Sequence, residues 1–190
     1  MTPPTGIDGR VARGIERRQL IARAVVDVVA EFGLRGLTHR RVADAAEVPL
    51  GSTTYHFATL DDLMTAGLEL AADRNLDLMR AWAERMTGDT DIATWLTDLT
   101  IEMVTTWHDH NVAERELYLE AIRVSALRPI ARRWDDECAR ILTPHVGSED
   151  AARLMVWAMD GLAVTLLMSD APPDRGRILS RMTYLRNSLR

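Results

Sequence analysis

Residues 38–57 read THRRVADAAEVPLGSTTYHF. This pattern predicts a short helix with Thr38 as its N-cap, a tight turn near Glu47 and a second short helix over residues 49–56. The apolar residues that can hold the two helices together are Val42, Ala46, Val48 and Phe57. The outward positions carry hydroxyl groups, an aromatic ring and an imidazole, which suit phosphate oxygens and base edges. Two short helices joined by a turn predict a helix-turn-helix, whose second helix enters the major groove of DNA.

Apolar residues recur with a helical period on both sides of this stretch. Before it, the period is carried by Ile21, Val25, Val28 and Phe32. After it, apolar stripes run over residues 60–86, 92–107, 113–122, 130–141, 151–168 and 178–189. The sequence therefore predicts an all-α fold of about nine helices, in which a three-helix helix-turn-helix domain precedes a larger helical bundle.

Length and composition are those of a folded globular protein. The chain has 190 residues, of which 47% are hydrophobic and 27% are charged. The most apolar segment, residues 154–168, contains Asp160 and is shorter than the roughly 20 residues of a membrane span. The only cysteine is Cys138, and the opening MTPPTGIDGR lacks the apolar stretch of a secretory signal. We therefore expect a cytoplasmic protein without a membrane span, and no cofactor.

The net charge of −5 is distributed unevenly. Every basic residue is an arginine, and residues 1–57 carry eight arginines against six acidic residues, whereas the rest of the chain is acidic. This asymmetry favours an amino-terminal module that meets a polyanion.

In order, spacing and composition, residues 15–70 resemble the amino-terminal domain of the TetR family of transcriptional regulators. The matching features are the amphipathic helix over 21–33, the Thr38 cap, VPLGSTTYHF at 48–57 and Asp61-Asp62-Leu63. The sequence departs from the family pattern at Glu47, where the turn commonly has glycine, at Thr54, where an aromatic residue is common, and at Leu60, where a lysine is frequent. A non-glycine residue costs on the order of 1 kcal/mol if the backbone at Glu47 is left-handed.

The resemblance implies DNA contacts for the helix-turn-helix. Phosphate contacts are expected for Thr38 and His56, a phosphate or base-edge contact for Tyr55, and base-edge contacts for Leu50, Ser52 and Thr54. The planar guanidinium of Arg40 suits a guanine, and Arg41 suits the backbone. The alternatives are a solvent-facing or helix-capping imidazole for His56 and an ordinary solvated face for the two arginines. We expect a flexible arm over residues 1–14. The arginines in this arm and directly after it could contact the DNA backbone or minor groove, or could only solubilise the chain. They are Arg10, Arg13, Arg17 and Arg18.

The resemblance also implies a division into a helix-turn-helix domain at 15–58 and an effector-binding and dimerisation domain at 59–190. Homodimerisation is expected through the helices at about 149–170 and 174–189, although a helix buried within a monomer would also explain the apolar segment 151–168. Large aromatic and thioether side chains can line a pocket for a largely apolar small-molecule effector. The candidate lining residues, each of which could equally be ordinary core, are Trp95, Met103, Trp107, Tyr118, Ile122 and Trp134.

The sequence thus predicts a DNA-binding transcriptional regulator, a ligand-responsive repressor that binds a palindromic operator as a homodimer. Two other classes remain open: a protein-binding scaffold of the same fold that does not bind DNA, and a helical-bundle enzyme. No catalytic motif is present, so we expect no enzyme activity. His108 and His110 near Glu114 are more typical of a polar loop than of a metal site, so no metal is expected.

Overall fold

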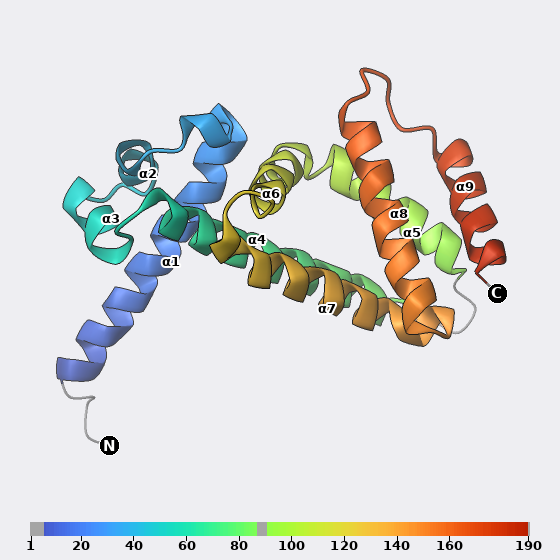
Figure 1. Cartoon of the computed structure of the whole chain (residues 1–190), viewed down its shortest axis with the longest axis horizontal. Helices are drawn as coiled ribbons and strands as arrows, with labels where there is room; N and C mark the ends of the chain where they lie inside the picture. Colours follow the sequence, from blue (N-terminus) through green and yellow to red (C-terminus); the bar gives the residue numbers. More distant parts are fainter. Residues whose placement is uncertain (1–5, 87–90, 190) are drawn as a thin grey trace. The chain divides into compact units, whose positions relative to one another are not determined.

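A computed structural model describes residues 6–86 and 91–189. These residues form nine α-helices, two short 3-10 turns and no strand (Figure 1). The helices are α1 (Gly6–Phe32), α2 (His39–Ala45), α3 (Leu50–His56), α4 (Leu60–Glu84), α5 (Ile92–Thr105), α6 (His108–Glu120), α7 (Arg128–Val146), α8 (Glu149–Leu167) and α9 (Arg175–Ser188). The predicted all-α fold is confirmed.

The chain divides into two compact units, and the division falls inside helices. Unit 1 consists of Met1–Ala71 and Ala113–Arg128, and unit 2 of Ala72–Val112 and Pro129–Arg190. Both α4 and α6 therefore contribute residues to both units. The functional boundary expected near residue 58 stays a prediction. Of the arm expected over 1–14, the residues from Gly6 onward are helical, and residues 1–5 lie outside the described residues.

Unit 1 is held together by close packing of α1, α4 and α6. Gly67 on α4 is buried, and a Cβ atom there would lie 2.6 Å from Cγ1 of Val25 on α1 and 3.5 Å from Cδ1 of Leu117 on α6. In addition, the Glu116 carboxylate accepts a 2.5 Å hydrogen bond from the backbone N–H of Leu34, which follows α1. The second part of α6 is therefore tied to the helix-turn-helix domain, an arrangement that the sequence pattern did not predict.

The segment α2–turn–α3 has the predicted local structure. The Thr38 hydroxyl accepts a 3.2 Å hydrogen bond from the Arg41 N–H and caps α2. The turn contains Glu47 at φ 52°, which is the only non-glycine residue with positive φ among the described residues. The turn is closed by a 3.0 Å hydrogen bond from the Val48 N–H to the Ala43 carbonyl.

The first turn of α4 is a reciprocal capping arrangement. The Asp62 N–H donates to the Thr59 hydroxyl at 3.1 Å, and the Thr59 N–H donates to the Asp62 carboxylate at 2.9 Å. The hydrogen bonds from the side chain and backbone of Thr59 lower the pKa of Asp62 below its ordinary value. The reciprocal hydrogen bonds between Thr59 and Asp62 therefore fix the point at which α4 begins after α3.

Unit 2 is built around α5, which packs against both α8 and α9. Its core contains side chains with at most 4% of their surface exposed, such as Leu99, Leu142, Met155 and Met182. At the surface, the Arg175 guanidinium on α9 pairs with both oxygens of Asp98 on α5 at 2.8 and 3.1 Å. None of the described helices is long and apolar enough to cross a membrane.

Replacing Glu47 by glycine is expected to raise the free energy of unfolding by about 0.5–1 kcal/mol, because glycine adopts a positive φ without steric strain from Cβ. Urea unfolding followed by circular dichroism measures the change. Glu47→Ala removes the same side chain but keeps Cβ, so it should give no such gain. Equal stability of the two variants would contradict strain at this turn.

Thr38→Ala is expected to lower the free energy of unfolding by about 1 kcal/mol, because α2 loses its only side-chain cap. Thr38→Ser keeps the accepting oxygen and should retain most of the stability. The same urea titration separates the two variants, and an alanine variant as stable as the serine variant would show that the cap contributes nothing.

Candidate functional site

The outward face of α3 is the strongest candidate for a functional surface in unit 1. Tyr55 has 85% of its surface exposed and Leu50 has 47%, while Thr54 is also exposed and Ser52 is half-buried. At Gly51 a Cβ would meet no atom within 4 Å, so the middle of this face is open. We call Leu50, Gly51, Ser52, Thr54 and Tyr55 the α3 surface. It offers hydroxyl groups, a phenol and an apolar side chain on one short helix.

The opposite face of α3 is buried and anchors the helix. Thr53 is fully buried, and its hydroxyl donates to the Leu50 carbonyl at 2.8 Å. Phe57, which directly follows α3, is only 1% exposed. These residues fix α3 against α2 and α1 and leave the α3 surface facing solvent.

The two predicted DNA-contacting residues on α2 differ in the contacts that their guanidinium groups make. Arg40 is exposed, and its guanidinium makes no hydrogen bond or ion pair with the described residues. The Arg41 guanidinium donates a 2.7 Å hydrogen bond to the Gly36 carbonyl and lies 4.8 Å from the centre of the Phe32 ring. Arg41 therefore also stabilises the connection between α1 and α2. The Thr38 hydroxyl is likewise engaged as the cap of α2.

His56 is half-buried at the end of α3, and its ring meets the Tyr55 ring edge-on at 5.1 Å between centroids. Its backbone carbonyl receives a hydrogen bond from Arg18 on α1. Sequence reasoning missed this use of Arg18, because the two residues are 38 positions apart and no local pattern reports the contact. Seven of the eight predicted DNA-contacting residues lie on α2 or α3, and the eighth, Thr38, caps α2. Their individual contacts stay predictions.

The six predicted pocket residues are divided between the two units. Trp95, Met103, Trp107 and Trp134 belong to unit 2, where Trp95 and Met103 are buried and the other two are half-buried. Tyr118 and Ile122 belong to unit 1, and Ile122 is 73% exposed. Four of the six therefore share unit 2, and the role of all six as pocket lining stays a prediction.

Trp95 belongs to the apolar core of unit 2, and Trp82 and Trp134 pack against that core. The Trp134 indole N–H donates to the Asn75 side chain at 3.2 Å, and the Trp95 indole N–H donates to the Trp82 carbonyl at 3.1 Å. The Trp82 and Trp95 rings meet edge-on at 6.3 Å. The indole nitrogens of Trp82 and Trp107 are buried without a hydrogen-bond partner among the described residues.

Carboxylates lie near the buried thiol of Cys138 on α7. Burial raises the pKa of this thiol well above its ordinary value, and the charges of Asp160 and Asp135 add to the rise. Asp160 lies on α8 and Asp135 on α7, and both are half-buried. Both carboxylates are thus close enough for their charge to act on the Cys138 thiol.

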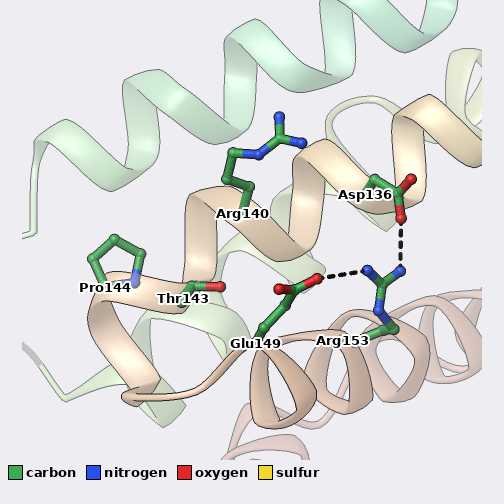
Figure 2. Close-up of a pocket in the computed structure, with 6 residues that line it drawn as sticks. All are labelled: Asp136, Arg140, Thr143, Pro144, Glu149 and Arg153. Carbon is green, nitrogen blue, oxygen red and sulfur yellow. Dashed lines mark hydrogen bonds and ion pairs between the residues drawn. The ribbon is translucent and has the colours of Figure 1, made fainter.

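A polar groove of about 550 Å³ lies between α7 and the start of α8 (Figure 2). In Figure 2 the Arg153 guanidinium lies between the carboxylates of Asp136 and Glu149, at 2.8 and 3.1 Å. The remaining lining residues are Arg140, Thr143 and Pro144. None of the predicted pocket residues lines this groove. Two carboxylates, Asp136 and Glu149, and two guanidinium groups, Arg140 and Arg153, line the groove, so its formal charges balance.

The His108–His110 segment forms the first turn of α6, where His108 Nδ1 lies 2.9 Å from the Asp109 carboxylate. Within residues 6–86 and 91–189, no group of three or more histidine, cysteine, aspartate or glutamate side chains is arranged to hold a metal ion.

Comparison with known proteins relates the chain to known transcriptional regulators. Residues 87–186 match the model of the tetracyclin repressor-like C-terminal domain. The HTH-type transcriptional regulator PksA of Bacillus subtilis (strain 168) is 31% identical over 70 residues, which are 37% of this chain and 34% of PksA. The chain thus spans about a third of the length of that curated relative.

Solved structures extend the similarity over nearly the whole chain. The multidrug binding protein EbrR, in complex with imidazole, is 38% identical, covers 89% of this chain and 94% of its own, and superposes with a TM-score of 0.78. EbrR has also been solved with ethidium, proflavin and malachite green. A TetR-family member from Streptomyces coelicolor A3, SCO1917, is 39% identical over 90% of this chain and 98% of its own, with a TM-score of 0.76. Taken with the helix-turn-helix geometry of α2 and α3, these similarities show that the chain belongs to the TetR family of transcriptional regulators.

Proposed function

We propose that this protein is a ligand-responsive transcriptional repressor that binds a palindromic DNA operator as a homodimer. The observation that carries the proposal is the exposure of the α3 surface, where Tyr55 is 85% exposed. Thr53 and Phe57 anchor the opposite, buried face of this two-turn helix. A helix presented in this way fits the major groove of DNA. Because its proposed target is chromosomal DNA, the repressor would act in the cytoplasm.

The proposed DNA contacts follow from side-chain chemistry. Arg40 contacts a guanine, since its exposed guanidinium can donate to O6 and N7 together. Leu50, Ser52 and Thr54 meet base edges, while Tyr55 meets a base edge or a phosphate. The residues that contact the phosphate backbone are Thr38, Arg41 and His56. Arg41 can serve this role with the guanidinium nitrogens that the Gly36 carbonyl does not engage.

The proposed dimer forms through α8 and α9. The supporting observation is the apolar surface that α8 leaves exposed in the single chain, where Leu154 is 43% and Trp157 is 54% exposed. Met168 just beyond α8 and Tyr184 on α9 are 75% and 77% exposed. Large exposed apolar side chains on a structured helix are typical of an interface between protein chains. A two-fold dimer presents two copies of α3, as a palindromic operator requires.

For the effector we propose an aromatic cation, which refines the largely apolar ligand expected from the sequence. Three observations support this class: the aromatic side chains of unit 2, the carboxylates Asp135 and Asp160 near Cys138, and the dyes bound by EbrR. Aromatic rings and half-buried carboxylates attract such cations. The effector changes DNA affinity only through its different affinities for the two conformations of the dimer.

The DNA-binding proposal is tested by fluorescence anisotropy with two labelled duplexes, one of random sequence and one recovered by repeated selection from a random pool. The wild-type chain is expected to bind both, with an affinity that falls as salt rises. Tyr55→Ala should weaken binding to the selected duplex by about tenfold or more, because it removes the most exposed side chain of the α3 surface.

Leu119→Ala is the matched control, since Leu119 is 53% exposed in unit 1 but lies on α6. It should bind the selected duplex like the wild type, and sedimentation should show the same oligomeric state for all three proteins. If the wild type shows no salt-dependent association with either duplex, the DNA-binding proposal is contradicted and a scaffold of the same fold is favoured. If Tyr55→Ala binds as tightly as the wild type, α3 is not the reading helix.

The effector proposal is tested with malachite green in the absence of DNA, by quenching of tryptophan fluorescence. Asp160→Asn is expected to weaken malachite green binding by about tenfold, because it removes a half-buried negative charge that acts on Cys138, next to Trp134. The control, Asp170→Asn, changes an exposed carboxylate beyond α8 and should leave the affinity unchanged.

Saturating malachite green should then release the wild-type chain from the selected duplex, at a dye concentration that leaves the duplex alone unaffected. Binding of the dye without any change in DNA affinity would contradict ligand-responsive regulation. Equal affinities of both aspartate variants for the dye would contradict a cation site near Asp160.

A further inference from the structure

The recognition helix α3 is too short to hold its own position. It has seven residues, its N-cap residue Pro49 makes no side-chain hydrogen bond, and isolated helices of this length are unstable in water. Its last turn depends on the 2.8 Å hydrogen bond from the Phe57 N–H to the Thr53 carbonyl. The carbonyls at the end of a helix carry partial negative charge and need partners from outside the helix.

One such partner comes from α1. The Arg18 guanidinium donates a 3.5 Å hydrogen bond to the carbonyl of His56, the final residue of α3. The same guanidinium lies over the Phe57 ring, 4.6 Å from its centre, which is within the range of a cation–π contact. A single positive charge therefore meets the negative end of α3 and the aromatic side chain that anchors it.

Arg18 also acts on the start of the next helix. Its charge is among the factors that lower the pKa of Asp62, after the hydrogen bonds from Thr59 and Ala58. Asp62 forms the reciprocal cap with Thr59 that begins α4. The Arg18 side chain thus links α1 to the end of α3 and the beginning of α4.

We infer that Arg18 is a positioning residue: its guanidinium holds the last turn of α3, and with it Tyr55 and His56, at the angle needed to read DNA. This inference rests on the proposed DNA-binding function. It assigns Arg18 a role inside the protein, in place of the phosphate contact that its position among the amino-terminal arginines allowed. Loss of a positioning residue lowers the affinity for the preferred DNA sequence relative to other sequences, whereas loss of a phosphate contact lowers the affinity for every duplex.

The first test compares two DNA affinities of Arg18→Ala. Binding to the selected duplex should weaken by about tenfold, since a charge-assisted hydrogen bond and a cation–π contact are lost. Binding to the random duplex should keep its strength and its salt dependence, because no phosphate contact is removed. Arg18→Lys retains a cation near the His56 carbonyl and should recover part of the selectivity. Arg23→Ala, an exposed arginine on the same helix, should behave like the wild type.

The second test uses no DNA, so it remains informative if the proposed function fails. Hydrogen exchange of the Phe57 amide, measured by NMR on the free protein, should be several-fold faster in Arg18→Ala than in the wild type and unchanged in Arg23→Ala. The thermal midpoints of the variants show that the fold is retained.

Two results would overturn the inference. In the first, Arg18→Ala weakens binding to both duplexes alike and the slope of log affinity against log salt becomes shallower by about 0.9, the signature of one lost phosphate contact. In the second, the Phe57 amide exchanges at the wild-type rate in Arg18→Ala. If the wild type does not bind DNA, the proposed function is contradicted. The exchange rate of the Phe57 amide would then still test whether Arg18 stabilises the last turn of α3.

Discussion

The burial of one face of α3 is the constraint on which the rest of the molecule's chemistry depends. A two-turn helix cannot persist alone, so its position is set by Thr53 and Phe57, which are at most 1% exposed. Because these residues face inward, Tyr55 must face outward. The cap at Thr38, the left-handed turn at Glu47 and the capping pair Thr59–Asp62 then fix where the chain enters and leaves this helix.

The sequence predicted those parts of the fold that local chemistry controls. The Thr38 cap, the turn near Glu47 and the boundaries of α3 follow from short-range patterns, and the structure confirms all three. Helical periodicity likewise indicated the long helices, because an apolar stripe of period 3.6 matches the geometry of an α-helix and not the two-residue alternation of a strand.

Contacts between distant residues could not be predicted in this way. The hydrogen bond from Leu34 to Glu116 joins positions 82 apart, and the Arg18–His56 bond joins positions 38 apart. Neither residue type signals its partner, since an exposed arginine or glutamate fits equally well on a solvated surface. The same limit explains Ile122. It continues the apolar stripe predicted over residues 113–122, but it lies two residues beyond α6 and is 73% exposed. Periodicity shows which side chains share a face but not what covers that face.

Both α4 and α6 contribute residues to the two units, so each of these helices runs from one unit into the other. The proposed effector site lies in unit 2, whereas the proposed DNA-binding surface lies on α3 in unit 1. Regulation then requires only that the effector prefer one conformation of the dimer, and the ratio of its affinities for the two conformations limits how far it shifts DNA binding.

The central claim is that two copies of α3 enter the major groove from one side of a duplex. Hydroxyl-radical footprinting of the wild-type chain on the selected duplex tests it most directly. The account predicts two protected blocks related by two-fold symmetry, on one face of the duplex and separated by whole turns of about 10–10.5 base pairs. A single protected block without a symmetric partner, or two blocks on opposite faces, would contradict it.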